Sequence, residues 1–262
     1  MPAALKGLGV FVSWWLNTVM TNRKVSFVLT SCNRFDLLKP TLEAFKAQNA
    51  YPLHQFIVIE DSGKEEVRDV VVAAGFTDAQ IIVNEKQLGQ MASIDKAYAE
   101  VTGEFIFHCE DDWEFYRPGF IEESIKLLDS DEKIVQVAIR DRSEMYDWAV
   151  NGEKKELDGI AYRVIAPDVH PRWFGYSFNP GLRRLKQFKE IGKSFAAIGH
   201  ENEISMHFKA LGYYMVVLEN GAVRHLGRRR TVRDPVHYRP ITRPEKWLNS
   251  IKKRWRKLAG RY

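Results

Sequence analysis

Short apolar segments rich in β-branched residues alternate with segments of helical periodicity over residues 25–115. Such alternation is typical of parallel strands joined by right-handed helical crossovers. The sequence therefore predicts an α/β fold built on a mostly parallel sheet flanked by helices. The strands expected in this region are Val25–Thr30, Gln55–Glu60, Ile81–Val83 and a segment that begins at Phe105.

Apolar residues at helical spacing occupy the intervals between these strands. Leu38, Leu42 and Phe45 share one face of a first helix, whose early turns tolerate Pro40. Residues 140–180 are less regular and rich in aromatic residues, which favours either a pocket wall or plain packing. Further helices are expected over residues 65–74, 90–101, 118–128 and 201–211, and further strands over 134–139, 213–218 and 222–226.

Polar residues follow three of the expected strands, at positions 30–34, 60–61 and 110–112. The carboxyl ends of parallel strands lie at one edge of a sheet, and ligands of such folds bind beyond that edge. We therefore expect the three polar clusters to meet in one site.

The most acidic cluster lies in the segment Phe105–Phe115, which reads F-I-F-H-C-E-D-D-W-E-F. Carboxylates at the tip of a buried strand must meet solvent, a cationic side chain or a metal ion, because unpaired buried charge is costly. Hard divalent cations prefer such oxygen ligands. Taken alone, the cluster predicts either a metal site or a solvated turn before a helix that starts at Pro118.

Charge is unevenly distributed along the 262-residue chain, whose net charge is +5. Residues 224–262 contain 14 Lys and Arg and 2 Asp and Glu, a net charge of +12, whereas residues 1–223 contain 25 and 32, a net charge of −7. A basic tail on an acidic body suggests an anionic partner such as membrane lipid, a phosphorylated substrate or nucleic acid. Trp247, Ile251, Trp255 and Leu258 share one helical face of that tail, which suits an anionic membrane surface or packing on the body.

The N-terminal apolar run Gly7–Met20 is shorter than the ~20 residues that a spanning helix needs. It predicts a helix that packs on the body or lies in a membrane interface. The two cysteines, Cys32 and Cys109, are too far apart for a CxxC pair, so we expect both to be reduced. The expected location is the cytoplasm, free or peripheral on the inner face of the membrane.

Several motifs occur together in the order and spacing of a known family. They are V-S-F-V-L-T-S-C-N-R from Val25, I-V-I-E-D-S-G from Ile57, the segment 89–106 and E-D-D at 110–112. Over roughly Val25–Gly227 the chain resembles the inverting GT-A glycosyltransferases of family 2. The resemblance implies a Rossmann-like GT-A fold and sugar transfer from a nucleotide-diphosphate donor. Asp95 departs from it, since the family usually has Asn there.

The resemblance also implies roles for individual residues on the donor side. Thr30 and Asp61, together with Glu60, match positions that contact the nucleotide. The triplet at 110–112 stands as E-x-D in place of the usual D-x-D. Asp112 then binds a divalent cation, Mn²⁺ or Mg²⁺, and Glu110 and Asp111 belong to the nucleotide site.

On the acceptor side, G-H-E-N-E-I at 199–204 aligns with the family's G-E-D-x-D-L. Glu201 falls at the catalytic base, which accepts the proton of the incoming hydroxyl. His200 replaces the preceding acid, so the base is either Glu201 or Glu203. His225, in V-R-H-L-G, matches a histidine that completes the metal site in part of the family; the alternative is a hydrogen-bonded histidine at a strand end.

Three parts are expected along the chain: an N-terminal helix over 1–22, a catalytic domain over 23–230 and a basic amphipathic tail over 231–262. Residues 23–115 would form the nucleotide-binding half of the domain and 116–230 the acceptor half. The Arg228–Arg230 run would either fold over the diphosphate or stay solvated.

The expected activity is that of a metal-dependent, hexosyltransferase-like inverting glycosyltransferase in the synthesis of surface polysaccharide, lipopolysaccharide or glycolipid. Its partners would be a nucleotide-diphosphate sugar, a glycan or lipid-linked acceptor, and an anionic membrane through residues 244–262, with no nucleic acid. One alternative is a non-catalytic GT-A-like protein that binds membrane or nucleic acid through the tail. The other is a sugar nucleotidyltransferase, which would need a G-x-G-x-R loop where Thr30–Arg34 stands.

Overall fold

A computed structural model of the chain describes residues 23–145, 151–169, 175–227 and 251. The chain divides into two units, Met1–Val232 and Arg233–Tyr262, and every element below belongs to the first. The predicted N-terminal helix over 1–22, the Arg228–Arg230 run and the basic tail, Ile251 apart, lie outside the described residues. The division predicted within the catalytic domain stays a prediction.

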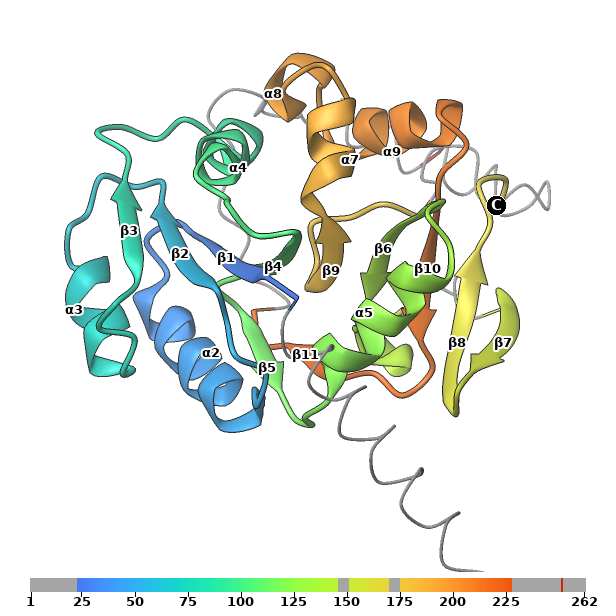
Figure 1. Cartoon of the computed structure of the whole chain (residues 1–262). Coiled ribbons are helices and arrows are strands. Elements are labelled where there is room, and N and C mark those ends of the chain that lie inside the picture. Colours follow the sequence, from blue (N-terminus) through green and yellow to red (C-terminus); the bar gives the residue numbers. More distant parts are fainter. Residues whose placement is uncertain (1–22, 146–150, 170–174, 228–250, 252–262) are drawn as a thin grey trace, which may run out of the picture. The chain divides into compact units, whose positions relative to one another are not determined.

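One nine-stranded sheet, in the order β3-β2-β1-β4-β9-β6-β10-β8-β7, organises the described part of the chain (Figure 1). Strands β8 and β9 run against the other seven, so the sheet is mixed but largely parallel in direction. Its strands are β1 Val25–Ser31, β2 Gln55–Glu60, β3 Gln80–Val83, β4 Phe105–Glu110, β6 Ile134–Ala138, β7 Glu153–Leu157, β8 Ile160–Ile165, β9 Gly181–Arg184 and β10 Tyr214–Leu218. A separate pair joins β5 Trp113–Phe115 to β11 Val223–His225.

The helices cover both faces of the sheet. Helices α2, α3 and α5 lie on one side and α4, α7, α8 and α9 on the other (Figure 1). The apolar side chains of the first set join one core cluster and those of the second set join another. The helices are α2 Phe35–Gln48, α3 Val67–Ala73, α4 Gln90–Ala99, α5 Phe120–Ser130, α7 Leu185–Glu190, α8 Phe195–Ile198 and α9 Glu201–Ala210, with a short 3₁₀ turn at Arg142–Glu144. The predicted α/β class is therefore confirmed.

Strand β1 is buried on both faces, as expected for a central parallel strand. Phe27 stacks on Phe107 of β4 at 5.5 Å between ring centroids and meets Phe45 of α2 at 4.1 Å. This aromatic packing holds α2 against β1 and β4. Within the described residues, no helix combines the length and the apolar character needed to cross a bilayer.

The segment predicted to be irregular, 140–180, contains a β-hairpin. Strands β7 and β8 are joined by Asp158 and Gly159, whose φ angles are +49° and +80°. Positive φ at both residues is typical of a type I′ turn, which matches the twist of the flanking strands. The aromatic stretch 170–174 lies outside the described residues.

Candidate functional site

The three polar clusters meet at one edge of the sheet, as the sequence predicted. The register of β1 pairs Thr30 with Glu110 of β4 and Ser31 with Glu60 of β2. Because these strands are parallel, their carboxyl ends lie side by side, and the residues that follow each strand share one space.

The acidic cluster is buried and is not a solvated turn. Asp111 and Asp112 are 0% and 3% exposed. Thr41 of α2 holds the turn, since its hydroxyl donates to the carbonyl of Asp111 at 3.1 Å and accepts from the amide of Trp113 at 3.0 Å. Helix α5 begins only at Phe120, after β5, so it does not cap these acids.

Arg34, which precedes α2, neutralises the buried acids. Its Nη1 donates to Asp112 Oδ2 at 2.6 Å, and its Nε donates to Asp111 Oδ2 at 3.2 Å. A third bond joins Nη2 to Asp111 Oδ1, and the amide of Cys32 donates to Asp111 Oδ2 at 3.3 Å. Burial nevertheless raises the pKa of Asp111 to about 6 against the opposing effect of Arg34. Both Asp111 oxygens are therefore engaged by protein donors.

Glu110 ends β4 and carries the most perturbed carboxyl group of the cluster. Burial, followed by the charges of Asp112, Glu201 and Asp111, raises the pKa of Glu110 to about 8. Its two oxygens accept hydrogen bonds from Gln90 Nε2 at 3.0 Å and from Trp113 Nε1 at 3.3 Å. The charge of Glu201, which opens α9 Glu201–Ala210, is among the causes of this raised pKa.

The β5–β11 pair brings His225 to the acidic turn from more than 100 residues away. His225 is directly opposite Trp113, and their rings make an edge contact at 4.8 Å between centroids. His225 Nε2 lies 3.5 Å from Asp112 Oδ2. Burial lowers the pKa of His225 although Asp112 acts in the opposite direction, which favours the neutral imidazole that ligates metals.

Asp112 and His225 have the chemistry to hold a divalent cation. Asp112 Oδ1 and His225 Nδ1 are buried and have no hydrogen-bond partner among the described residues. A Cβ at Gly227 would lie 2.4 Å from Asp112 Oδ2, so the space beside this carboxylate depends on glycine. Oxygen and imidazole donors suit Mn²⁺, with phosphate and water as further ligands. The described residues contain no group of three or more His, Cys, Asp or Glu arranged to bind a metal alone.

The two acids after β2 differ in what they contact. Asp61 accepts hydrogen bonds from Asn84 Nδ2 at 2.8 Å, Ser93 Oγ at 2.8 Å, Leu88 N at 2.8 Å and Gly89 N at 2.9 Å, so it fixes the loop before α4. Glu60 is fully buried, and one of its oxygens accepts from the amides of Asn33 and Ser62, both at 2.9 Å. Its other oxygen, Oε2, has no hydrogen-bond partner among the described residues.

Glu201 and Glu203 open α9 but point to different environments. Glu201 is partly buried, and its Oε2 accepts from the amide of Phe178 at 2.9 Å. Glu203 is exposed, and its Oε2 accepts from the amide of His200 at 3.0 Å, as in a capping box. Asp95 of α4 accepts from the amides of Phe195 and Ala196 at 2.8 and 2.9 Å and so ties α4 to α8.

Three contributors to this site were not singled out from the sequence: Arg34, Gln90 and the amide of Phe178. Arg34 is 77 residues from Asp111, so no local pattern marks the pair. Its position directly after a strand end and the need of a buried acidic cluster for a cation were the available signals.

Comparison with known proteins agrees with this architecture. Residues 26–196 match the family described as Glycosyl transferase family 2. Over 109 residues the chain is 31% identical to YwdF of Bacillus subtilis (strain 168), an uncharacterized glycosyltransferase. That match covers 41% of the chain and only 39% of the relative.

Solved structures share the fold at low sequence identity. A mannosyltransferase from Pyrobaculum calidifontis, PcManGT, in complex with GDP-Man and Mn²⁺, has a TM-score of 0.61 at 13% identity, over 80% of this chain and 59% of that one. TarS of S. aureus has a TM-score of 0.55 at 15% identity, over 76% and 36%. A mycobacterial protein has a TM-score of 0.56 at 13% identity, over 83% and 71%. The fold is GT-A-like.

Proposed function

The chain belongs to glycosyl transferase family 2, and from this membership and the geometry of the acidic edge we propose that it is an inverting glycosyltransferase. It would move a sugar from a nucleotide-diphosphate donor to a hydroxyl group of an acceptor. The observation that carries the proposal is the pairing of Asp112 with His225 next to Glu110 at the carboxyl end of β4, with the charge of Glu201 on α9 acting on Glu110.

The donor side of the site is built from the ends of β1, β2 and β4. Glu60 presents a buried carboxylate oxygen with no protein partner among the described residues, which suits an N–H group of a nucleobase. Thr30 lies one residue before the end of β1, beside Glu110 in register. In our proposal Glu60 and Thr30 contact the nucleotide, while Asp61 shapes the loop around it.

The diphosphate is the leaving group, and its negative charge grows as the sugar–oxygen bond breaks. A divalent cation held by Asp112 and His225 would offset that charge as a Lewis acid. Asp111 acts through Arg34, which donates two hydrogen bonds to it. Glu110, whose pKa responds to the charges of both Asp112 and Glu201, is assigned to the ribose or to a water molecule.

Glu201 is the proposed general base. In the reaction the acceptor oxygen forms a bond to the anomeric carbon, its proton passes to the Glu201 carboxylate, and the nucleoside diphosphate departs with the electrons of the broken bond. One such displacement inverts the anomeric configuration. The hydrogen bond that the Phe178 amide donates to Glu201 and the effect of the Glu201 charge on Glu110 favour this residue over the exposed Glu203.

The acceptor is proposed to be a lipid-linked or otherwise anionic glycan. This assignment rests on the net charge of +12 over residues 224–262 and on the two tryptophans of the tail. Charge reversal at Lys252, Lys253, Arg254 and Arg256 should weaken binding to anionic vesicles. Unchanged vesicle binding and unchanged activity would refute the membrane part of the proposal.

The activity is tested without an acceptor by measuring nucleoside diphosphate release from a panel of sugar nucleotides with Mn²⁺, water being the acceptor. Glu201→Gln should lower kcat by roughly 10²- to 10⁴-fold, the usual contribution of a general base. Glu203→Gln is the matched control and should stay within about threefold of the wild type. Proton NMR of the released sugar should show inversion, and a retained configuration would contradict the mechanism.

A further inference from the structure

Arg183 is a buried cation on the side of the sheet that faces α8 and α9. It lies on β9 opposite Ile106 of β4 and is 3% exposed. Among the described residues it forms no ion pair with a carboxylate at bonding distance. A buried charge without an ion-pair partner is costly, so its surroundings must compensate for the lost hydration.

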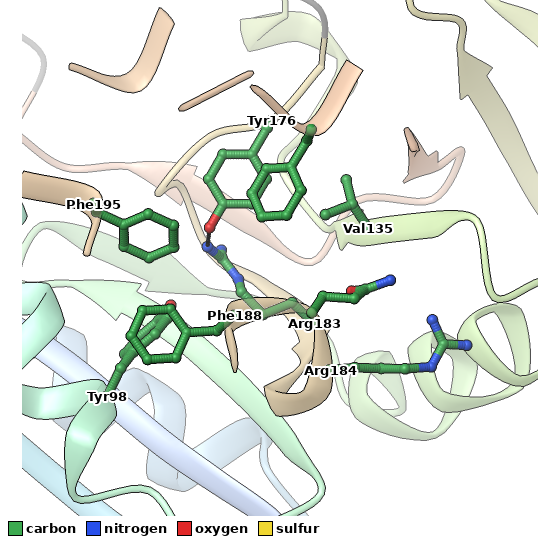
Figure 2. A pocket seen from close by; sticks show the side chains of 9 residues that line it. Tyr98, Val135, Tyr176, Arg183, Arg184, Phe188 and Phe195 are labelled. Carbon is green, nitrogen blue, oxygen red and sulfur yellow. Dashed lines mark hydrogen bonds between the residues drawn. The ribbon is translucent and has the colours of Figure 1, made fainter. Parts of the chain in front are cut away.

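The guanidinium is held by the three residues Tyr176–Phe178, which we call the 176–178 segment. Nη1 donates to the Tyr176 hydroxyl at 2.9 Å and Nη2 to the carbonyl of Ser177 at 3.2 Å. The group also lies 5.2 Å from the ring centroid of Tyr176 and 5.6 Å from that of Phe178, within the range of cation–π attraction. Figure 2 shows Arg183 directed at the Tyr176 hydroxyl, with Phe195 and Tyr98 nearby.

The same segment binds the proposed base. Its three successive amides donate to side chains of the surrounding elements: Tyr176 to Ser205 Oγ at 3.2 Å, Ser177 to Gln136 Oε1 at 3.2 Å, and Phe178 to Glu201 Oε2 at 2.9 Å. A shift of the segment would therefore move the hydrogen bond that orients Glu201.

The charges of the Arg183 guanidinium and the Glu201 carboxylate also interact. Burial acts to lower the pKa of Arg183, but Tyr176, Tyr98 and Glu201 outweigh it, so its pKa lies above the usual value. Within the part of the chain that the structure describes, the groups whose charge interacts with Glu201 include Glu110 on β4, Arg183 on β9 and Tyr176 in the segment. Arg183 contributes a positive charge to this set.

We propose that Arg183 is a positioning residue for the proton-accepting carboxylate of Glu201. It fixes the 176–178 segment, whose Phe178 amide orients Glu201, and its buried positive charge favours the ionised carboxylate. The inference rests on the proposed function and adds to it a residue that touches neither donor nor acceptor.

A purely structural role predicts a different result from an electrostatic one. If Arg183 only filled the core, an apolar side chain of similar length would serve as well. If it acts on Glu201, loss of the charge must disfavour the ionised carboxylate and move the acidic limb of the pH–rate profile to higher pH.

The test compares Arg183→Met with the wild type in the donor-hydrolysis assay. Arg183→Met should lower kcat by roughly 10- to 100-fold, the scale of a misplaced catalytic group, with KM for the donor within about threefold. The acidic limb of the pH profile of kcat should move to higher pH. Arg183→Lys should restore part of the kcat and part of the wild-type pH profile because it keeps the positive charge.

Arg184→Met is the matched control. Arg184 is the next residue and donates to the carbonyl groups of Leu128 and Ile134, not to the 176–178 segment. It should lower the melting temperature without moving the acidic limb. If Arg183→Met does not fold, Tyr176→Phe carries the test, since it removes one acceptor of the guanidinium and should reduce kcat in the same direction.

A folded Arg183→Met variant with wild-type kcat and an unmoved limb would overturn the inference, as would equal effects in Arg184→Met. These results leave the proposed function intact. A wild-type protein that neither binds nor hydrolyses any sugar nucleotide would instead refute the proposed function, and this inference with it.

Discussion

Arg34 Nη1 lies 2.6 Å from Asp112 Oδ2, the same oxygen that His225 Nε2 approaches to 3.5 Å. One oxygen of the acidic turn is thus shared between a fixed cation and an imidazole. The arrangement lets two adjacent carboxylates stay buried at the carboxyl end of β4, while Asp112 Oδ1 has no hydrogen-bond partner among the described residues.

Removal of Arg34 should destabilise the protein strongly. Arg34→Met leaves Asp111 and Asp112 buried without their cation, which typically costs about 3–5 kcal/mol. Lys39→Met, which breaks an exposed ion pair with Glu43 on the same helix, should cost no more than about 0.5 kcal/mol. Urea unfolding at neutral pH measures both. Equal losses in the two variants would show that Arg34 is not needed to neutralise the turn.

Gly227 should be essential for ligand binding at Asp112. In Gly227→Ala the new methyl group would lie 2.4 Å from Asp112 Oδ2, so the carboxylate must move. We expect Mn²⁺-dependent binding of a nucleoside diphosphate to weaken by roughly tenfold or more, because oxygen ligands tolerate little displacement. Leu226→Ala, at the exposed neighbouring position, should stay within about twofold. Calorimetric titration gives both affinities, and similar affinities would contradict the placement of the ligand.

Asp95 should contribute stability through α8 and not through the donor site. Asp95→Ala removes the acceptor of two amides and should cost about 1–2 kcal/mol, as for loss of a helix cap. Asp95→Asn keeps one acceptor oxygen and should cost less. The exposed Asp69 provides the control, since Asp69→Ala should change stability by no more than about 0.5 kcal/mol. An unchanged melting temperature in Asp95→Ala would contradict the role of Asp95 as a cap of α8.

Stability of the metal-free protein should depend on pH through Glu110. Its pKa is about 8 in the folded protein against an ordinary 4.5, so the folded state binds this proton more tightly than the unfolded state. The resulting stabilisation is full below about pH 4.5 and is lost as the pH rises through about 8. In EDTA, the stability of the wild type relative to Glu110→Gln should therefore fall between about pH 5 and pH 9. A pH-independent difference between the two would contradict the raised pKa.

The meeting of the polar clusters could be predicted from the sequence because it follows from local patterns. Apolar, β-branched runs mark β1, β2 and β4, and parallel strands bring their carboxyl ends together. The hairpin β7–β8 was missed, although Asp158-Gly159 is a strong two-residue turn signal. The exposed, charged strand β7 lacks the apolar alternation that marks other strands.

Pairings between distant residues could not be predicted in the same way. The cation that neutralises Asp111 is Arg34, and the donor that orients Glu201 is a backbone amide, Phe178. Backbone amides carry no residue-type signal, and the partner of a buried acid is fixed by tertiary packing. The sequence indicated that the buried acids needed a cation or solvent, but not which group supplied it.

Thermal unfolding shows whether the acidic edge binds a nucleotide-diphosphate sugar. The melting temperature should rise with one nucleoside diphosphate or its sugar in Mn²⁺, stay unchanged in EDTA, and show no rise in Asp112→Asn, because only ligands of the folded state stabilise it. No change in melting temperature with any nucleotide, or an equal rise in Asp112→Asn, would contradict a donor site at the acidic edge.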